Sequence, residues 1–469
     1  MSAASLSPAV SPALAVIGAD RTVPVLGGFE RRYINLDNAA STPALACVRD
    51  TVNEFLEWYS NVHRGAGYKS RLSSWAFERA RDRVARFVRA DPKDEVVIFC
   101  KNATEAINRV AHRLPFREGD VVVTTVMEHH SNELPWRRAA SVVHVGVLPD
   151  GRVDEEEIAA RLSEHRGRVR LLAVSGASNV TGYVNPIHDW ARLAHEAGAE
   201  ILVDAAQLAP HRPIDMRPKS SPEHLDYVAF SAHKIYAPFG VGVLVANRAV
   251  FETGDPDLVG GGTVDIVDLE SAYWTDLPDR EEAGTPDIVG VVALARAIRA
   301  FEEIGWEALI RHEAALTAHA LVRLKAIPDV VLYGDTDPSR AAERLGVIPF
   351  NVRGLPHALT AAVLSCEFGI GTRHGCFCAH PYVKELLHVS EREARQVESR
   401  ILSRDRSVIP GTVRASFGIY NTPEDVTALA EALAAMSRRQ FRGGYVLDAE
   451  RGEYSHPDLP VDFASRFDF

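Results

Sequence analysis

The stretch that decides the fold begins at Ile201-Leu-Val-Asp204-Ala-Ala-Gln207 and continues at Tyr227-Val-Ala-Phe-Ser231-Ala-His233-Lys234, with a further apolar run at residues 241–245. Short apolar runs that end at polar residues are typical of buried strands. Asp204 and Lys234 then follow the carboxyl ends of two strands, the edge at which open α/β sheets bind ligands. A lysine and an acid at this edge fit pyridoxal phosphate, because the lysine can form a Schiff base with the aldehyde while the acid pairs with the pyridinium nitrogen. Taken alone, the two residues are explained equally well by a buried ion pair.

The size and composition of the chain are those of a large globular protein. Its 469 residues exceed one ordinary hydrophobic core, so two domains are predicted. The hydrophobic content of 46% and the charged content of 25% are ordinary values for packed domains. A formal net charge of −11 without basic runs argues against nucleic acids and anionic membranes as partners. No run of about eighteen uncharged apolar residues predicts a membrane span.

The cysteines and the amino terminus indicate a reducing compartment. Five cysteines are too few and too unevenly spaced for a disulfide framework, so we expect reduced thiols and a cytoplasmic protein. Residues 1–28 are rich in Ala, Ser, Pro and Val and carry no basic residue before Arg21, which argues against a secretory signal. We expect residues 1–30 to form an arm that packs across a dimer.

Outward from the central stretch, the apolar pattern predicts an alternation of strands and helices. An amphipathic helix contains Phe77, Ala80 and Val84, and Asn102 precedes Glu105 as a helix-start signal. From about residue 288 a smaller α/β domain is predicted, with helices at 291–304, 306–326 and 425–436. The expected strands lie at residues 33–37, 96–99, 121–126, 171–175, 330–333, 347–352 and from 413 onward.

Several motifs occur in one chain order that matches a known family. Beside VDAAQ (203–207) and SAHKIYAPFG (231–240) they are NLDNAAST (35–42), NVHRG (61–65), ATEAIN (103–108), MEHHSN (127–132), SNVTG (178–182), AGTPD (283–287), RHGCFCAHP (373–381) and RASFGIYNT (414–422). The set resembles the class V aminotransferase-fold enzymes, in particular the group II cysteine desulfurase and selenocysteine lyase branch, over roughly residues 31–435. The resemblance implies an α/β fold of the aspartate aminotransferase-like type (fold type I). We expect an arm (1–30), a large cofactor-binding domain with a mostly parallel sheet (31–287), a small domain (288–436) and a tail (437–469) that serves as a dimer contact or a lid.

The resemblance also implies a role for each residue that matches a family motif. The cofactor would be pyridoxal 5'-phosphate, and Lys234 would bind it covalently. The other expected cofactor contacts are Ala103 and Thr104 at the phosphate, His129 stacked on the ring, Asn179 and Gln207 at the ring oxygen, Asp204 at the pyridinium, and Ser231 with His233 at the phosphate. Thr285 would reach the phosphate of the other subunit, which implies a homodimer. Taken from the residues alone, helix capping, a turn asparagine and a structural histidine explain several of these positions equally well.

The substrate residues implied by the resemblance are Arg414, Asn38 and Ala39. Arg373 could assist Arg414 in binding the substrate, or it could only tune Cys378. A planar guanidinium matches a carboxylate with two parallel hydrogen bonds, so Arg414 as carboxylate anchor implies an amino-acid substrate. Residues 38–43 are small and turn-forming, which suits close approach to a ligand.

The segment Arg373-His-Gly-Cys376-Phe-Cys378-Ala-His380-Pro supports three interpretations. Alternating His and Cys could bind a metal, but strict alternation on a strand places side chains in a line rather than a tetrahedron, so no metal is expected. Cys376 and Cys378 could form a redox pair. A thiolate beside Arg373 and two histidines could act as a nucleophile.

The resemblance favours the nucleophile and aligns Cys378 with the persulfide-forming cysteine. The chain departs from the group II pattern, which usually has two histidines before that cysteine where this sequence has Cys376 and Phe377. In this respect the loop resembles that of the molybdenum-cofactor sulfurases. The resemblance implies conversion of L-cysteine to L-alanine, with sulfur passed from Cys378 to an acceptor protein. The alternatives are a C–S lyase, a selenocysteine lyase, an isopenicillin N epimerase-like enzyme and a non-catalytic scaffold.

Overall fold

A computed structural model describes residues 15–459 and 463–467. Its centre is a seven-stranded sheet in which β10 alone runs opposite to the other six strands. In spatial order the strands are β4 (Glu95–Cys100), β10 (Gly242–Asn247), β9 (Tyr227–Ser231), β8 (Glu200–Asp204), β7 (Val169–Ser175), β5 (Val121–Thr125) and β6 (Ser141–Val145). The mostly parallel sheet of the expected fold class is confirmed.

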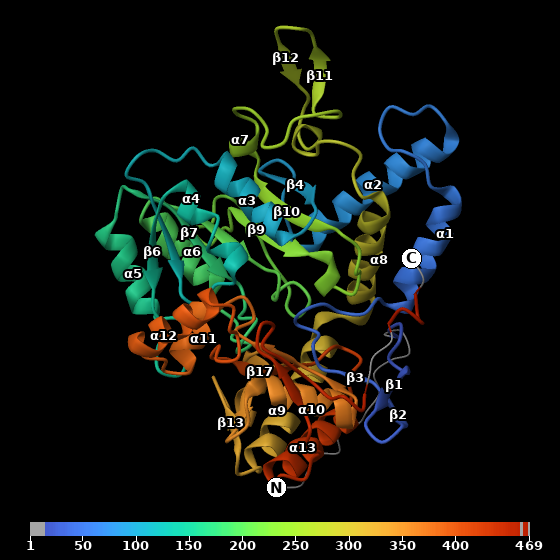
Figure 1. Ribbon diagram of the computed structural model, residues 1–469. Coiled ribbons are helices and arrows are strands. Elements are labelled where there is room, and N and C mark those ends of the chain that lie inside the picture. Colours follow the sequence, from blue (N-terminus) through green and yellow to red (C-terminus); the bar gives the residue numbers. More distant parts are fainter. Residues whose placement is uncertain (1–14, 460–462, 468–469) are drawn as a thin grey trace.

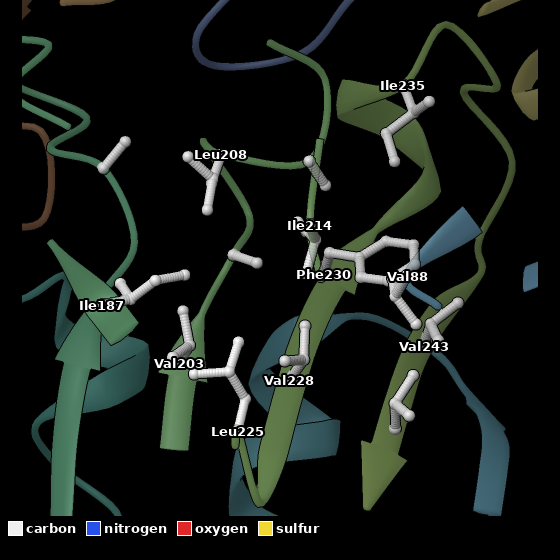
Figure 2. Close-up of a cluster of buried hydrophobic side chains, with 14 of the residues drawn as sticks. Val88, Ile187, Val203, Leu208, Ile214, Leu225, Val228, Phe230, Ile235 and Val243 are labelled. Atoms are coloured by element: carbon white, nitrogen blue, oxygen red, sulfur yellow. The ribbon is translucent and has the colours of Figure 1, made fainter. Parts of the chain in front are cut away.

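The central strands are apolar throughout because both faces of the sheet are covered. Successive side chains point to opposite faces, so Val203, Val228 and Val243 enter one cluster while Leu202 and Leu244 enter the other. Figure 2 shows the first cluster, in which these three valines from neighbouring strands lie with Phe230. This double burial explains why the strands read as continuous apolar runs in the sequence.

Helices cover the two faces of the sheet unequally. One face packs on α3 (Ala103–Arg113), whose Ala106, Ile107 and Val110 are buried. The other face packs on α1 (Ala46–Trp58), α2 (Tyr68–Phe87), α5 (Glu155–Glu164), α6 (Ile187–Glu196) and α8 (Ile288–Ile304). The short helices α4 (Trp136–Ala139) and α7 (Arg248–Phe251) lie in the connections.

A second, four-stranded antiparallel sheet lies at one end of the molecule, at the bottom of Figure 1. Its order is β13 (Val330–Leu332), β14 (Val347–Val352), β17 (Thr412–Ser416) and β16 (Arg373–Gly375). It packs with α9 (Trp306–Lys325), α10 (His357–Phe368) and α13 (Pro423–Ser437). Beyond β16 the chain forms α11 (His380–Leu386) and α12 (Glu391–Leu402).

The division into domains stays a prediction. Two segments pack against a different sheet from the one expected for their domain. The predicted strand at 33–37 is only β3 (Ile34–Asn35), which pairs in parallel with β15 (Ile370–Gly371), and Ile34 packs in the core of the small sheet. Helix α8 was expected in the small domain, but it packs on α1 and α2 beside the large sheet. Both assignments depend on contacts between distant segments, which local periodicity does not contain.

One hairpin from each end of the described chain rests on α10. The hairpin β1 (Thr22–Val25) and β2 (Phe29–Arg32) contacts α10, and the Leu26 N–H donates to the Cys366 carbonyl. The hairpin β18 (Val446–Asp448) and β19 (Glu453–Ser455) packs on the same helix. Residues 1–14 of the expected arm and residues 460–462 and 468–469 of the tail lie outside the described residues.

A third hairpin, β11 (Val264–Val267) and β12 (Ala272–Trp274), projects at the opposite end of the molecule in Figure 1. Within residues 15–459 and 463–467, no helix has the length and apolar composition needed to span a bilayer.

Candidate active site

A cavity of about 370 Å³ opens at the carboxyl ends of the central strands. It collects most of the residues singled out from the sequence, although they come from both sheets. These lining residues include Ala39, Ala103, Thr104, His129, Asn179, Asp204, Gln207, Ser231, His233, Lys234, Arg373, Cys378 and Arg414. The cavity therefore joins the lysine, the acid, the thiol and both arginines in one space.

Lys234 and Asp204 form the buried end of this space. β9 ends at Ser231, and a single 3₁₀ turn (Ala232–Lys234) carries the lysine into the cavity. Burial lowers the pKa of Lys234 to about 8, against the opposing effect of Asp204 and with the help of Arg414. Burial raises the pKa of Asp204, opposed by the Ala206 N–H, which donates to its Oδ1 at 2.9 Å, and by Lys234. A lysine with this pKa is a better nucleophile toward an aldehyde than an exposed one.

His129 follows β5 and is held in one neutral form. The Ser131 N–H donates to His129 Nδ1 at 3.1 Å, and the Ser131 hydroxyl lies 3.0 Å from the same atom. Burial lowers the pKa of His129 to about 3, and the charges of Lys234 and Arg414 lower it further. A neutral imidazole that accepts at Nδ1 carries its hydrogen on Nε2. His129 can therefore donate a hydrogen bond from Nε2 at neutral pH.

The amino terminus of α3 forms an anion cradle at another wall of the cavity. Asn102 caps the helix by accepting from the Glu105 N–H, and the Ala103 N–H donates to Ser231 Oγ at 2.8 Å. A Cβ on Gly242 would lie 2.3 Å from the backbone of Asn102, so only glycine lets this turn rest against β10. Exposed N–H groups and the helix dipole favour a phosphate at such a terminus.

The residues present fit pyridoxal phosphate. The cavity combines an amine, a buried acid, a neutral imidazole and a helix amino terminus, which match the aldehyde, ring nitrogen, ring and phosphate of this cofactor. Gln207 donates to the Ala39 carbonyl at 2.7 Å, whereas its Oε1 is buried without a partner. A buried acceptor left open in a lining residue indicates a polar ligand. Asn179 donates to the Phe377 carbonyl at 2.8 Å and keeps a second amide hydrogen for a ligand.

Two arginines on neighbouring strands share one carboxylate. Arg414 of β17 lies opposite Arg373 of β16, and both approach Asp37, at 2.8 Å and 3.5 Å respectively. Arg414 also donates to the Asn179 carbonyl at 2.9 Å, and its Nε is buried without a partner. Burial lowers the pKa of Arg414, and Asp37 opposes the shift. Two guanidinium groups against one carboxylate leave one positive charge in excess, which favours an anionic substrate group.

The cysteine loop is not a continuous strand. β16 ends at Gly375, and Phe377 and Cys378 then adopt left-handed backbone conformations with φ of 51° and 57°. The Arg414 guanidinium packs over the Phe377 ring, 4.8 Å from its centroid. Within the described residues, no group of three or more His, Cys, Asp or Glu side chains is placed to hold a metal ion.

The two thiols of this loop differ in environment. Cys378 is exposed and lines the cavity. Cys376 is buried, and its Sγ donates to the Pro410 carbonyl at 2.9 Å. Burial raises the pKa of Cys376 to about 11, so this thiol stays protonated at neutral pH. Of the two, Cys378 is the one placed for nucleophilic attack.

Two predicted residues do not reach the cavity of this chain. The side chain of Asn38 is buried in an internal network, where it donates to the Ser416 carbonyl and accepts from the Tyr420 hydroxyl. Its neighbour Ala39 lines the cavity instead. Thr285 is exposed and lies outside the lining residues, so its role at a partner subunit stays a prediction.

Sequence reasoning missed two carboxylates. Asp37, inside NLDNAAST, pairs with both arginines. Glu128, inside MEHHSN, accepts from Thr125, Asn132 and Ser175 and thereby holds the segment that carries His129. Burial raises the pKa of Glu128 to about 7, against these hydrogen bonds. Both residues lie inside motifs quoted from the sequence, and that position was their only signal.

Comparisons with known proteins agree on one family. Residues 34–429 match the sequence profile described as aminotransferase class-V. A probable cysteine desulfurase of Halalkalibacterium halodurans is 35% identical over 410 residues, which cover 85% of this chain and 92% of that protein. A cysteine desulfurase of Haloferax volcanii is also 35% identical, with 86% and 89% covered. An apo structure of a cysteine desulfurase from Thermococcus onnurineus superposes with a TM-score of 0.76 at 32% identity, covering 87% of this chain and 95% of that one.

Proposed function

The chain belongs to the class V aminotransferase family, and from this premise we propose that it is a cysteine desulfurase dependent on pyridoxal 5'-phosphate. The reaction converts L-cysteine and the Cys378 thiol to L-alanine and a Cys378 persulfide. The observation that carries the proposal is that an exposed thiol, a buried lysine and two arginines line one cavity. A C–S lyase or a racemase on the same scaffold has no need of that thiol.

The arginines select the substrate. Because Arg373 and Arg414 share only Asp37, a substrate carboxylate neutralises their remaining positive charge. The unpartnered Nε of Arg414 supplies a donor for this contact. Binding the carboxylate here holds the substrate between Lys234 and Cys378, which line the same cavity.

Lys234 transfers the substrate protons, and His129 donates a hydrogen bond. When bound, the cofactor supplies an electron sink for the pair released at the substrate Cα. With a pKa near 8, the amine of Lys234 can take the α-proton at Nζ and return a proton later. His129 stays neutral and donates from Nε2, while Asp204, which lines the same cavity, would pair with the ring nitrogen of the cofactor. These roles of individual residues are part of the proposal.

Cys378 performs the sulfur chemistry. Its thiolate attacks the substrate sulfur, the new S–S bond forms, and the substrate Cβ–S bond breaks. The departing carbon takes a proton, so the products are L-alanine and the Cys378 persulfide, and no external oxidant is needed. Cys376 does not compete, because its Sγ is buried on the Pro410 carbonyl.

The test is the identity of the products from L-cysteine in the presence of a thiol reductant. We expect alanine and sulfide in equal amounts, measured by amino-acid analysis and sulfide trapping. Pyruvate and ammonia in place of alanine would indicate a C–S lyase, and D-cysteine would indicate a racemase. Either result contradicts the proposed reaction while keeping the cofactor.

Arg414→Lys is expected to weaken substrate binding. Lysine keeps the charge but loses the planar fork, so kcat/KM for L-cysteine should fall about 10-fold to 100-fold, mainly through KM. Steady-state kinetics measures this change. L-cysteine methyl ester, which has no carboxylate, provides the control and should be used equally by parent and variant. An equal fall for ester and acid would contradict the anchor role.

The partners follow from the site. We propose a homodimer in which Thr285 completes the partner's phosphate site, consistent with its exposure in the single chain. The loop between β16 and α11 is short, so a sulfur acceptor protein must approach Cys378 itself. All five cysteines are unpaired, which supports a reducing compartment such as the cytoplasm.

A further inference from the structure

The conformation of Cys378 requires support from outside its own loop. Two consecutive residues other than glycine, Phe377 and Cys378, have positive φ, which costs about 1 kcal/mol or more each. Such conformations persist only where neighbouring groups hold them. The Phe377 carbonyl is held by Asn179, and the Cys378 carbonyl accepts from the His130 N–H at 2.8 Å. The second contact comes from the segment that follows β5, in the large sheet.

The side chain of His130 reaches the same loop a second time. His380 Nδ1 lies 2.9 Å from His130 Nε2, with the two rings parallel within 7°. The His380 N–H also points at His130 Nε2, at 3.4 Å. This N–H belongs to the first residue of α11, where no intrahelical acceptor exists. His130 therefore contacts Cys378 through its backbone N–H and His380 through its ring.

We propose that His130 and His380 form a positioning pair that holds Cys378 in its left-handed conformation, with the thiol facing the cavity. The inference deepens the proposed function, on which it rests, by naming what places the sulfur-accepting thiol. His130 acts through its Nε2 acceptor and its N–H, and His380 acts through its Nδ1–H donor. Neither residue needs to touch substrate.

The electrostatic surroundings keep the acceptor available at neutral pH. Burial and His380 lower the pKa of His130, and Arg137 lowers it further, whereas Glu133 opposes them. Burial and Lys384 lower the pKa of His380. A neutral His130 ring keeps a free lone pair on Nε2, which accepts from His380.

The experiment compares His380→Ala, which removes the ring donor, with His130→Gln, whose Oε1 can accept where Nε2 did. In single-turnover reactions with L-cysteine, His380→Ala should form the Cys378 persulfide about tenfold more slowly, the loss expected for one hydrogen bond. His130→Gln should stay within about threefold of the parent, because the acceptor is retained. Persulfide is measured by mass spectrometry of the peptide that contains Cys378.

A second readout does not involve the reaction. Alkylation of Cys378 by iodoacetamide, without substrate, should be faster in His380→Ala than in the parent, because the released loop is more accessible. Cofactor absorbance should be the same in all proteins, which shows that the lysine site is intact. Slower persulfide formation together with faster alkylation in His380→Ala supports the pair.

Two results would overturn the inference. One is a parental rate of persulfide formation in His380→Ala, and the other is an equal tenfold loss in His130→Gln. If the parent forms no persulfide, the proposed function fails; a parental alkylation rate in His380→Ala would then also count against the pair.

Discussion

Substitution of Lys234 by alanine is expected to abolish desulfuration, with a loss of about 10⁴-fold or more in turnover. Lys234 is the only lysine among the described residues that line the cavity, and it is buried there beside Asp204. No other amine in this space can bind the cofactor aldehyde or take the α-proton. The variant should still bind the cofactor through the helix terminus, although without a covalent bond.

The measurement for Lys234→Ala is reduction with borohydride followed by mass spectrometry, alongside assays of alanine release. Lys101→Ala is the matched control, because Lys101 is exposed just before the cap of α3 and does not line the cavity. In the parent, covalent attachment of added cofactor should accelerate as the pH rises through about 8, where the amine loses its proton. Covalent cofactor at parental stoichiometry in Lys234→Ala would refute the assignment.

Cys378→Ala is expected to remove the persulfide and to lower alanine release from L-cysteine by about a hundredfold or more. The thiol is the proposed acceptor of the substrate sulfur, and no second exposed cysteine lines the described cavity. Cys376→Ala is a close control, since it removes a buried thiol two residues away that is bonded to a carbonyl. It should retain most of the activity.

Peptide mass spectrometry after addition of L-cysteine should show one added sulfur on the Cys378 peptide of the parent and of Cys376→Ala. Unimpaired alanine release in Cys378→Ala would eliminate the persulfide route and redirect attention to selenocysteine lyase chemistry. A persulfide on Cys376 would assign the two thiols the other way round.

The central sheet could be predicted from the sequence because its signals are local. Runs such as 201–204 and 227–231 are buried on both faces and end at polar residues. The pattern therefore predicted both the strands and the edge of the sheet at which the site lies. The motifs then supplied His129 and Asn179, which the structure places in the cavity. Their chemical roles stay predictions.

The rest depended on contacts between distant segments. Asp37 pairs with Arg414 and Arg373 only because β17 and β16 bring both arginines to it. The pairing of these two strands cannot be inferred from any single motif. The left-handed backbone conformations of Phe377 and Cys378, which place the exposed thiol, also have no signal in the local sequence. The His130–His380 pair joins residues 250 positions apart and leaves no periodic trace in the sequence.

The pairing of β16 with β17 has a consequence for substrate choice. Arg414 and Arg373 face each other across these strands, and only two residues separate Cys378 from the end of β16. The proposed carboxylate anchor thus lies in the small sheet and the thiol in the loop that leaves it, so the pairing of the two strands sets the separation between them. We expect that separation to favour an amino acid with the side-chain length of cysteine. Homocysteine is one methylene longer and would carry its sulfur past the thiol. The preference for cysteine over homocysteine would then come from backbone hydrogen bonds between β16 and β17, remote from the substrate.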